Sequence, residues 1–280
     1  MKVAVVTDST SDIHGSLEAE LGVTVVPLYV NFQDQVRKDY LEITTNQIFD
    51  GVKAGAAMPS TSQPTPVDFS REYERLLLNH DHVLSIHLSS KLSGTYASAE
   101  LSSRDFAGKV TIFDSAVASG AQAMMVERAV RMLREGKTLE DVVATLERVK
   151  RVTDLRFSVG SLDFLKKNGR IGGAQALIGG LLGIKPILHL NDGRVEAAGR
   201  ERGPRAALEN CIKHLREYKA KHGEVRAVYV YADKPADVDA LRAAGREIGV
   251  HEFAVLQTGA VISSHVGPGT YGVLAEPVNV

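Results

Sequence analysis

Short apolar runs alternate with stretches of helical period through the first half of the chain. The strands expected from this pattern are residues 2–7, 23–30, 83–88 and 109–114. The expected helices are residues 14–21, 44–54, 66–79, 94–103, 117–135 and 138–151. Alternation of this kind is typical of a parallel sheet with helices on both faces. The first half is therefore predicted to be an α/β, Rossmann-like domain.

The second half carries a different pattern, in which hairpins are mixed with helices. Residues 191–194 read Asn-Asp-Gly-Arg, a strong two-residue hairpin signal between apolar runs at 184–190 and 195–198. Further strands are expected at 156–159, 225–231, 251–256, 259–265 and 271–275, and helices at 204–221 and 235–246. This mixture predicts an α+β domain with a mixed, mostly antiparallel sheet. The charged helix end at 147–151 marks the boundary, which gives domains of residues 1–153 and 154–280.

The charge balance narrows the class of protein. The chain has 33 basic and 34 acidic residues among 280, and its formal net charge is −1. Non-specific binding to nucleic acid or to a membrane surface normally needs a basic excess. We therefore expect no nucleic-acid partner.

The apolar segments and the cysteine content bear on the compartment. The most apolar stretch, 174–190, is interrupted by Lys185, Pro186 and His189, so we expect no stable membrane insertion. A strand pattern begins directly at Lys2, so we expect no signal peptide. Cys211 is the only cysteine, so no intrachain disulfide can form and a reducing cytoplasm is the expected location.

Polar residues follow three of the strands predicted for the first half. They occupy residues 7–11, 89–95 and 114–115. In a parallel sheet the ligand crevice lies beyond the carboxyl ends of the strands. These polar segments should therefore converge on one edge of the sheet.

The segment at 89–96 combines a strand end, a hydroxyl-rich loop and a helix start. A helix start leaves backbone N–H groups unpaired and carries partial positive charge, which suits an anion. Ser93 and Thr95 add donors, and Gly94 permits a close approach to the backbone. An ordinary serine-capped helix explains the same residues. The loop alone does not decide between a cap and a site.

A second hydroxyl cluster, Ser60-Thr61-Ser62, stands before two prolines that stiffen the chain at 64 and 66. Thr65 and Pro66 are explained as the N-cap and first residue of the following helix. That explanation leaves Thr61, Ser62 and Gln63 unassigned, so a ligand role for Thr61 stays open.

Two further segments carry candidate chemistry. Glycines between 172 and 183 allow either close core packing or room for an apolar ligand beside Leu177, Ile178, Leu181 and Leu182. His265 is held directly before a Gly-Pro-Gly turn at 267–269, although a lone histidine is more often structural than functional. No spacing typical of a metal site, and no nucleophile paired with a base, is recognisable, so we expect no metal and no catalytic residue.

Taken in order, several segments resemble the DegV family, whose members are bacterial fatty-acid-binding proteins. The matching segments are Val3–Thr10, Thr61–Pro66, Leu92–Tyr96, Gly169–Ile171, Ile184–Leu188 and His265–Gly269. Each is weak alone, but six in the right order are highly specific. The sequence departs from the family at Val266, where Thr is usual, and at Asn168, where Gly is frequent.

The resemblance implies a fatty acid buried between two domains. Its carboxylate would be held by Thr61 and Ser93, within loops that also contain Ser62, Gly94 and Thr95, with His265 near the same headgroup. Some members present the bound acyl chain to an ATP-dependent fatty acid kinase, and Arg170 and Arg202 match positions suited to docking that partner. The resemblance implies no cofactor other than the bound fatty acid.

The leading hypothesis is thus a non-catalytic carrier that shields a long-chain fatty acid and presents its carboxylate to a kinase. The alternative is a stand-alone acyl- or phosphoryl-transfer enzyme acting on a small anion. Such an enzyme would need a nucleotide or metal site of its own, which the sequence does not reveal.

Overall fold

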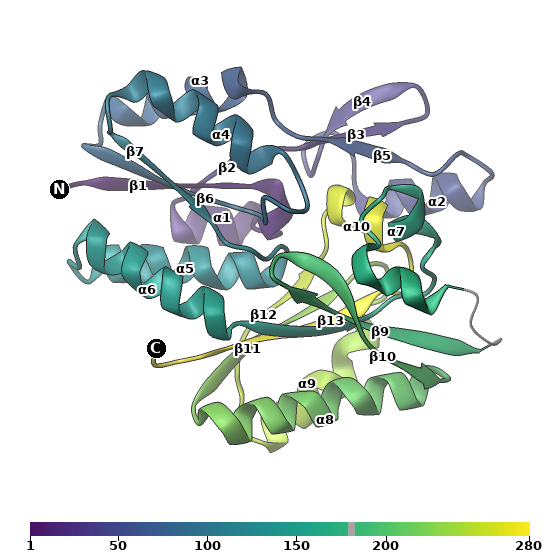
Figure 1. The fold of residues 1–280 in the computed structure, drawn as a ribbon. Coiled ribbons are helices and arrows are strands. Elements are labelled where there is room, and N and C mark those ends of the chain that lie inside the picture. Colours follow the sequence, from purple (N-terminus) through teal and green to yellow (C-terminus); the bar gives the residue numbers. More distant parts are fainter. Residues whose placement is uncertain (179–182) are drawn as a thin grey trace.

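The computed structural model describes residues 1–178 and 183–280, which form three sheets surrounded by helices (Figure 1). The strands are β1 (Val3–Asp8), β2 (Thr24–Val26), β3 (Tyr29–Phe32), β4 (Gln35–Lys38), β5 (Ser60–Ser62), β6 (His82–His87), β7 (Val110–Asp114), β8 (Asp154–Ser158), β9 (Ile184–Asn191), β10 (Arg194–Arg202), β11 (Val225–Tyr231), β12 (His251–Gln257) and β13 (Tyr271–Pro277). The α-helices are α1 (Gly15–Leu21), α2 (Thr45–Lys53), α3 (Pro66–Leu77), α4 (Thr95–Ser103), α5 (Gly120–Arg134), α6 (Leu139–Val152), α7 (Asp163–Lys167), α8 (Pro204–His222), α9 (Asp239–Glu247) and α10 (Ala260–Val266). Short 3-10 turns are η1 (Ser9–Ser11), η2 (Arg104–Phe106), η3 (Gly172–Leu177) and η4 (Pro235–Val238).

The first sheet is parallel and has the strand order β2-β1-β6-β7. Alternate residues of its strands face opposite ways, as the pleat requires. Val6 and Val83 pack with Phe69 and Tyr73 of α3, whereas Leu84 packs in the cluster that contains α5 and α6. The predicted parallel sheet with helices on both faces is confirmed.

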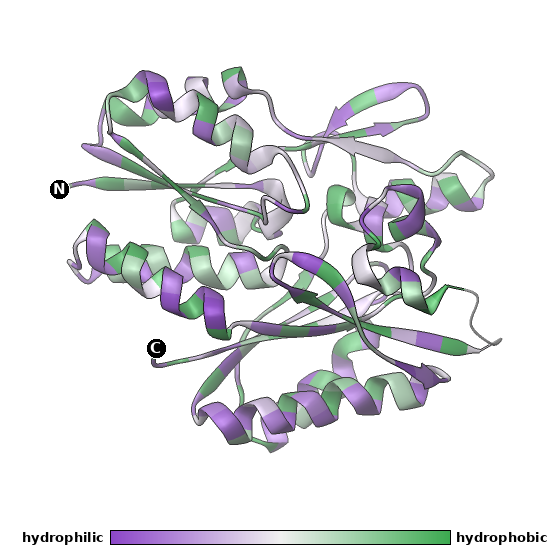
Figure 2. Ribbon diagram, in the orientation of Figure 1, coloured by the Kyte–Doolittle hydropathy of each residue, from purple (hydrophilic) through white to green (hydrophobic). Residues whose placement is uncertain are grey.

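The second sheet has six strands in the order β10-β9-β8-β13-β11-β12. All neighbouring strands are antiparallel except the β11–β12 pair, so the predicted mixed, mostly antiparallel sheet is confirmed. Helices α8 and α9 cover its outer side (Figure 1). Figure 2 shows α8 banded in apolar and polar residues, and its buried side contains Ala207, Cys211 and Leu215.

Helix α5 joins the two large sheets into one core. It lies between them in Figure 1, and its residues share a hydrophobic cluster with Val228, Val230 and Leu274 of the six-stranded sheet. A Cβ atom on Gly120 would stand 2.4 Å from Val228 Cγ1, so the absence of a side chain permits this close approach. The polar ends of the parallel strands are thereby brought against the six-stranded sheet.

A small antiparallel sheet, β4-β3-β5, corrects two expectations. The single strand predicted at 23–30 is divided into β2 and β3, which belong to different sheets, and the loop expected at 60–62 is β5. Both β5 and β3 are extended by pairing with each other, with Thr61 opposite Val30.

The strand predicted at 259–265 is wrong, because this segment is the helix α10. Its β-branched residues favour a strand locally, but tertiary contacts override that preference. Asp12 Oδ1 accepts the N–H of Gly259 at 2.9 Å, and Asp39 Oδ1 accepts that of Ala260 at 2.8 Å. Val261 packs with Leu28 and other residues of the small sheet.

Candidate functional site

A cavity lies where the polar strand ends meet the six-stranded sheet. It holds about 900 Å³ of empty space, its open mouth included. Most lining residues are apolar, among them Leu155 and Phe157 of β8, Val230 of β11, Leu274 of β13 and Val261 of α10. The lining suits an apolar ligand.

Several hydroxyl groups line the cavity but are occupied by protein partners. Ser119 Oγ donates to Asp12, Thr258 Oγ1 bonds Ser263 Oγ at 2.7 Å, and Thr270 Oγ1 donates to the Gly267 carbonyl at 2.8 Å. A hydroxyl already bonded within the protein offers little to a ligand. These residues therefore add little polarity to the wall.

Thr61 and His265 form a polar pair at one part of the cavity. Thr61 Oγ1 lies 2.8 Å from His265 Nε2, which joins β5 to the last turn of α10. The other ring nitrogen, Nδ1, is buried and has no hydrogen-bond partner in the described structure. Burial, with a smaller contribution from the charge of Arg170, lowers the pKa of His265 to about 4. The imidazole is therefore neutral at pH 7, with one unused polar atom.

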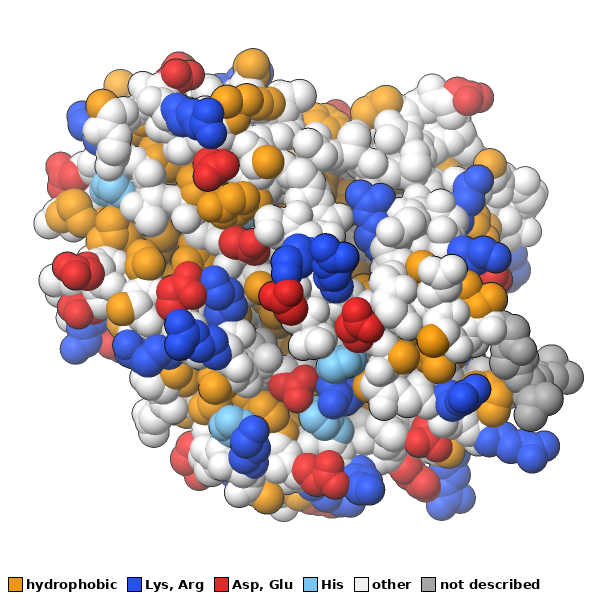
Figure 3. Space-filling view, viewed as in Figure 1, with side chains coloured by type: hydrophobic (Ala, Val, Ile, Leu, Met, Phe, Trp, Pro, Cys, Tyr) orange, Lys and Arg blue, Asp and Glu red, His pale blue; other side chains and the backbone are white. Residues whose placement is uncertain are grey.

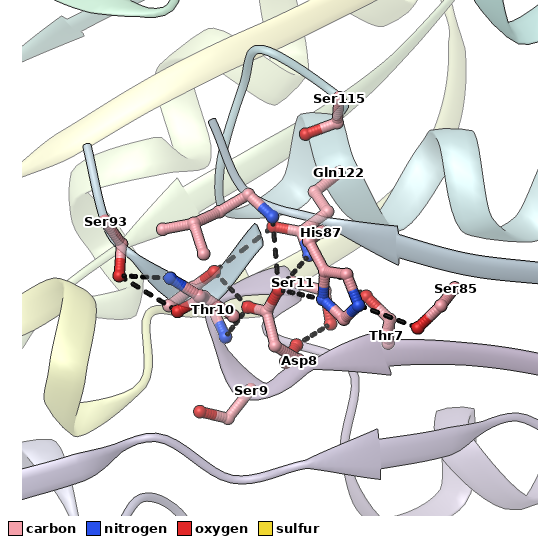
Figure 4. A network of polar contacts seen from close by, with 12 residues as sticks. Thr7, Asp8, Ser9, Thr10, Ser11, Ser85, His87, Ser93, Ser115 and Gln122 are labelled. Carbon is pink, nitrogen blue, oxygen red and sulfur yellow. Dashed lines mark hydrogen bonds and ion pairs between the residues drawn. The ribbon is translucent and has the colours of Figure 1, made fainter. Parts of the chain in front are cut away.

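Ser93 also lines the cavity, directly before α4. Its Oγ accepts the N–H of Thr95 at 3.3 Å and lies 2.9 Å from Thr95 Oγ1 (Figure 4). The N-cap position is Gly94, where a Cβ would stand 2.4 Å from Gln63 Nε2, so the Gln63 side chain crosses the helix start. Ser93 thus supports the first turn of α4 and faces the cavity, and the two readings of this loop are compatible.

The remaining predicted residues are placed differently. Thr95 is fully buried behind Ser93, whereas Ser62 is exposed on β5 and neither residue lines the cavity. Arg170 lines the cavity and donates to the carbonyls of Leu92 at 3.1 Å and Asn168 at 2.7 Å. Arg202 is exposed at the end of β10, away from the cavity lining.

Among the described residues of the glycine-rich run, 172–178 and 183, none lines the cavity. Leu177 packs in a hydrophobic cluster with Leu165 and Ala174, and Ile178 is exposed. Leu165 lines the cavity, whereas Leu177 does not. Gly179, Gly180, Leu181 and Leu182 lie outside the described residues. In this run, core packing is the observed role for Leu177.

A buried polar network that the sequence analysis did not predict joins the ends of β1 and β6 (Figure 4). Ser85 Oγ lies 2.7 Å from His87 Nε2, and His87 Nδ1 lies 2.9 Å from Asp8 Oδ2, which is the order of a Ser-His-Asp triad. All three side chains are fully buried, and Ser85 also accepts from Tyr73 and is absent from the cavity lining. The signal that could have revealed it is the pair of polar residues, 85 and 87, inside the apolar run at 83–88.

Asp8 is the centre of this network. Its carboxylate accepts from the N–H of Leu88 at 3.1 Å, the N–H of Thr10 at 3.1 Å and Gln122 Nε2 at 3.2 Å. These bonds lock the ends of β1 and β6 together at the edge of the sheet. Ser85 is fully buried and does not line the cavity, and the bonds of the network connect the two strand ends.

The residues that line the cavity suit an amphipathic anion, which has an apolar part and a negatively charged end. In residues 1–178 and 183–280 no group of His, Cys, Asp or Glu side chains could hold a metal ion, and no helix is long and apolar enough to cross a bilayer. Basic and acidic side chains are interspersed on the face drawn in Figure 3. Hydroxyls, a neutral imidazole and Arg170 gather at an otherwise apolar space.

Comparison with known proteins identifies relatives of this chain, some of which are described by their fatty acid binding. The model of the DegV family, described as uncharacterised, matches residues 2–278. A DegV domain-containing protein of Deinococcus radiodurans is 44% identical over the whole of both chains, and a fatty acid-binding protein of Thermotoga maritima is 34% identical over 97% of this chain and 96% of its own. The structure of a DegV family protein from Thermus thermophilus, described by its fatty acid binding, has 50% identity and a TM-score of 0.96, covering 99% of this chain and 100% of its own. The chain belongs to the DegV family.

Proposed function

We propose that this protein binds one long-chain fatty acid, with its acyl chain in the cavity and its carboxylate at Thr61 and Ser93. The lipid lies between a domain of residues 1–153 and a domain of residues 154–280. The observation that carries the proposal is the buried His265 Nδ1, which has no hydrogen-bond partner in the described structure and belongs to a residue that lines a largely apolar cavity beside Thr61. Relatives described as fatty-acid-binding proteins support it.

The two ends of the ligand contribute unequally to the free energy of binding. An acyl chain with roughly 14 buried methylenes gains on the order of 11 kcal/mol at about 0.8 kcal/mol each. Association and ordering of the chain take back a large part. Each charge-assisted hydrogen bond to the carboxylate adds about 1.5–3 kcal/mol. The tail supplies most of the affinity, and the hydroxyls fix which end of the ligand faces outward.

We further propose that the carboxylate is presented to a separate ATP-dependent kinase in the cytoplasm, which forms the acyl phosphate. Ser62, Gln63 and Arg170 are exposed around the headgroup residues, so a partner could reach this part of the surface. Arg202 is a second exposed basic residue for such docking. The protein itself then contributes binding and orientation, and the partner contributes the chemistry.

Extraction of the purified protein under denaturing conditions, followed by mass spectrometry, tests the proposal. We expect one fatty acid per chain, or uptake of added fatty acid to that ratio. Recovery of none, together with no uptake, would remove the proposal. ATP turnover by the isolated chain, abolished by Ser93→Ala, would instead favour a stand-alone transferase.

A further inference from the structure

Two buried carboxylates hold the beginning of α10. Asp39 accepts from Ser9 Oγ at 2.9 Å and from the N–H of Ala260 at 2.8 Å. Asp12 accepts from Ser119 Oγ, from Tyr40 OH at 3.0 Å and from the N–H of Gly259 at 2.9 Å. Asp12 is 0% exposed and Asp39 1%, so both bonds to the helix are shielded from water.

The helix that they hold forms part of the cavity. Val261, Ile262, His265 and Val266 of α10 all line it. His265 lies in the last turn, about 8 Å along the axis from Ala260 at 1.5 Å per residue. A shift or tilt at the first turn therefore changes the distance between His265 and Thr61.

Neither carboxylate has a cationic partner among the described residues. The titratable groups around Asp12 are Asp8, Tyr40 and Asp39, with the exposed His14 stacked on Tyr40 at 4.0 Å between ring centroids. Asp8 is itself paired with His87. Burial raises the pKa of Asp12 and of Asp39 to about 7. Burial likewise raises the pKa of Tyr40, which therefore stays neutral in this range.

We propose that Asp39 and Asp12 are positioning residues for the ligand carboxylate, because they seat the first turn of α10 and thereby set the contact of His265 with Thr61. The inference rests on the proposed function of the cavity. It assigns the role to residues that touch neither the cavity nor the ligand.

The sign of the expected pH effect follows from linkage. We call α10 seated when its first turn is bonded to Asp12 and Asp39, and displaced when these bonds are broken and the carboxylates are solvated. The pKa of each carboxylate is about 7 in the seated form and has its ordinary value in the displaced form. The seated form therefore binds more protons, and it loses stability relative to the displaced form as the pH rises from about 4 to about 7. Only the seated form presents His265 to Thr61, so the apparent affinity for fatty acid should fall over the same range.

The experiment measures the dissociation constant of a fluorescent long-chain fatty acid as a function of pH. For the wild type we expect affinity to fall roughly fivefold as the pH rises from about 5 to about 7.5, a change of about 1 kcal/mol. Asp39→Asn keeps an oxygen acceptor but cannot ionise, so its profile should be flatter. Asp34→Asn, at an exposed turn, is the matched control and should follow the wild type. His14→Gln should also follow it, which separates the carboxylates from the nearby imidazole.

The outcomes are distinct. If the wild type binds no fatty acid at any pH, both the proposed function and this inference are wrong. Binding with superimposable profiles for wild type, Asp39→Asn and Asp12→Asn overturns the positioning role alone. Should the variants not fold, the ¹⁵N shifts of His265 in the wild type decide: they should respond near pH 7 to the carboxylates, although the pKa of His265 is about 4. A response confined to the region of pH 4 contradicts the proposal.

Discussion

Two polar clusters of similar composition differ in their access to the cavity. The inner one, Asp8 with Ser85 and His87, is completely buried and every member is hydrogen-bonded within the protein. The outer one, Thr61 with Ser93 and His265, borders the cavity and leaves His265 Nδ1 without a partner. Residue type alone would favour the inner cluster as an active site.

The difference teaches that unused bonding capacity, and not a familiar order of side chains, distinguishes a ligand site from a structural network. A buried polar group without a partner costs free energy, so it persists where something else compensates it. In the inner cluster the protein supplies all partners. In the outer cluster the proposed fatty acid carboxylate supplies the missing one.

Replacing Asp8 by alanine should give the largest effect on stability. The change removes the partner of His87 Nδ1 and the acceptor of the Leu88 and Thr10 N–H groups in the core, and it takes one of two acceptors from Gln122 Nε2. We expect a loss of about 3–5 kcal/mol in the free energy of unfolding, measured by urea denaturation. A variant that unfolds like the wild type but no longer binds fatty acid would reverse the roles assigned to the two clusters.

Replacing the proposed headgroup hydroxyls should weaken binding, and it should also lower stability modestly because Thr61 bonds His265 and Ser93 bonds the first turn of α4. Thr61→Val and Ser93→Ala each remove one bond to the carboxylate, so we expect a loss of about 1.5–3 kcal/mol in affinity, measured by titration calorimetry. Ser62→Ala is a matched control, because it removes an exposed hydroxyl next to Thr61. Equal affinities for all three variants would exclude Thr61 and Ser93 from the headgroup site.

His265→Gln should change how stability depends on pH. The folded pKa of His265 is about 4, below its unfolded value of about 6.5, so its contribution to stability is present above pH 6.5 and is lost as the pH falls through 4. The contributions of Asp12 and Asp39 to stability are instead lost as the pH rises towards 7, because their folded pKa values are raised to about 7. The difference in melting temperature between ligand-free wild type and variant should therefore narrow on acidification. A constant difference from pH 7 to about 4 would mean that His265 titrates normally.

The smallest effect is expected from Gly94→Ala. Its Cβ would meet only the end of the Gln63 side chain, which is exposed and can move aside. We expect less than about a twofold change in affinity, since the α4 backbone is retained. A loss comparable to that of Ser93→Ala would indicate that Gln63 itself contacts the ligand.

The sequence was sufficient for elements whose local signals agree with their environment. The helix at 66–79 begins at Thr65 and Pro66 as expected, because the capping box with Asp68 is a local interaction. The segment at 259–265 was predicted wrongly, because the groups that hold α10 in place, Asp12 and Asp39, lie more than 200 residues away in the chain.

The same distinction applies to the site. Thr61, Ser93 and His265 were singled out by hydroxyl-rich loops, a stiff turn and a family resemblance, and the structure brings Thr61 and His265 together. The Asp8–His87 pairing joins residues 79 apart and leaves no motif in either segment. The sequence left the glycine-rich run open between core packing and a ligand wall, whereas Leu155, Phe157 and Leu274 of the six-stranded sheet provide part of the wall, since side-chain direction follows sheet packing.

The late position of α10 in the chain has a consequence for synthesis. Residues 260–266 complete the hydrophobic cluster of a small sheet whose strands lie between residues 29 and 62, and they deliver His265 to Thr61. A nascent chain emerging from the ribosome therefore carries Thr61 long before His265 can pair with it. The proposed headgroup site is one of the last parts of the molecule to assemble, so we expect a truncated product that ends before α10 to bind no fatty acid.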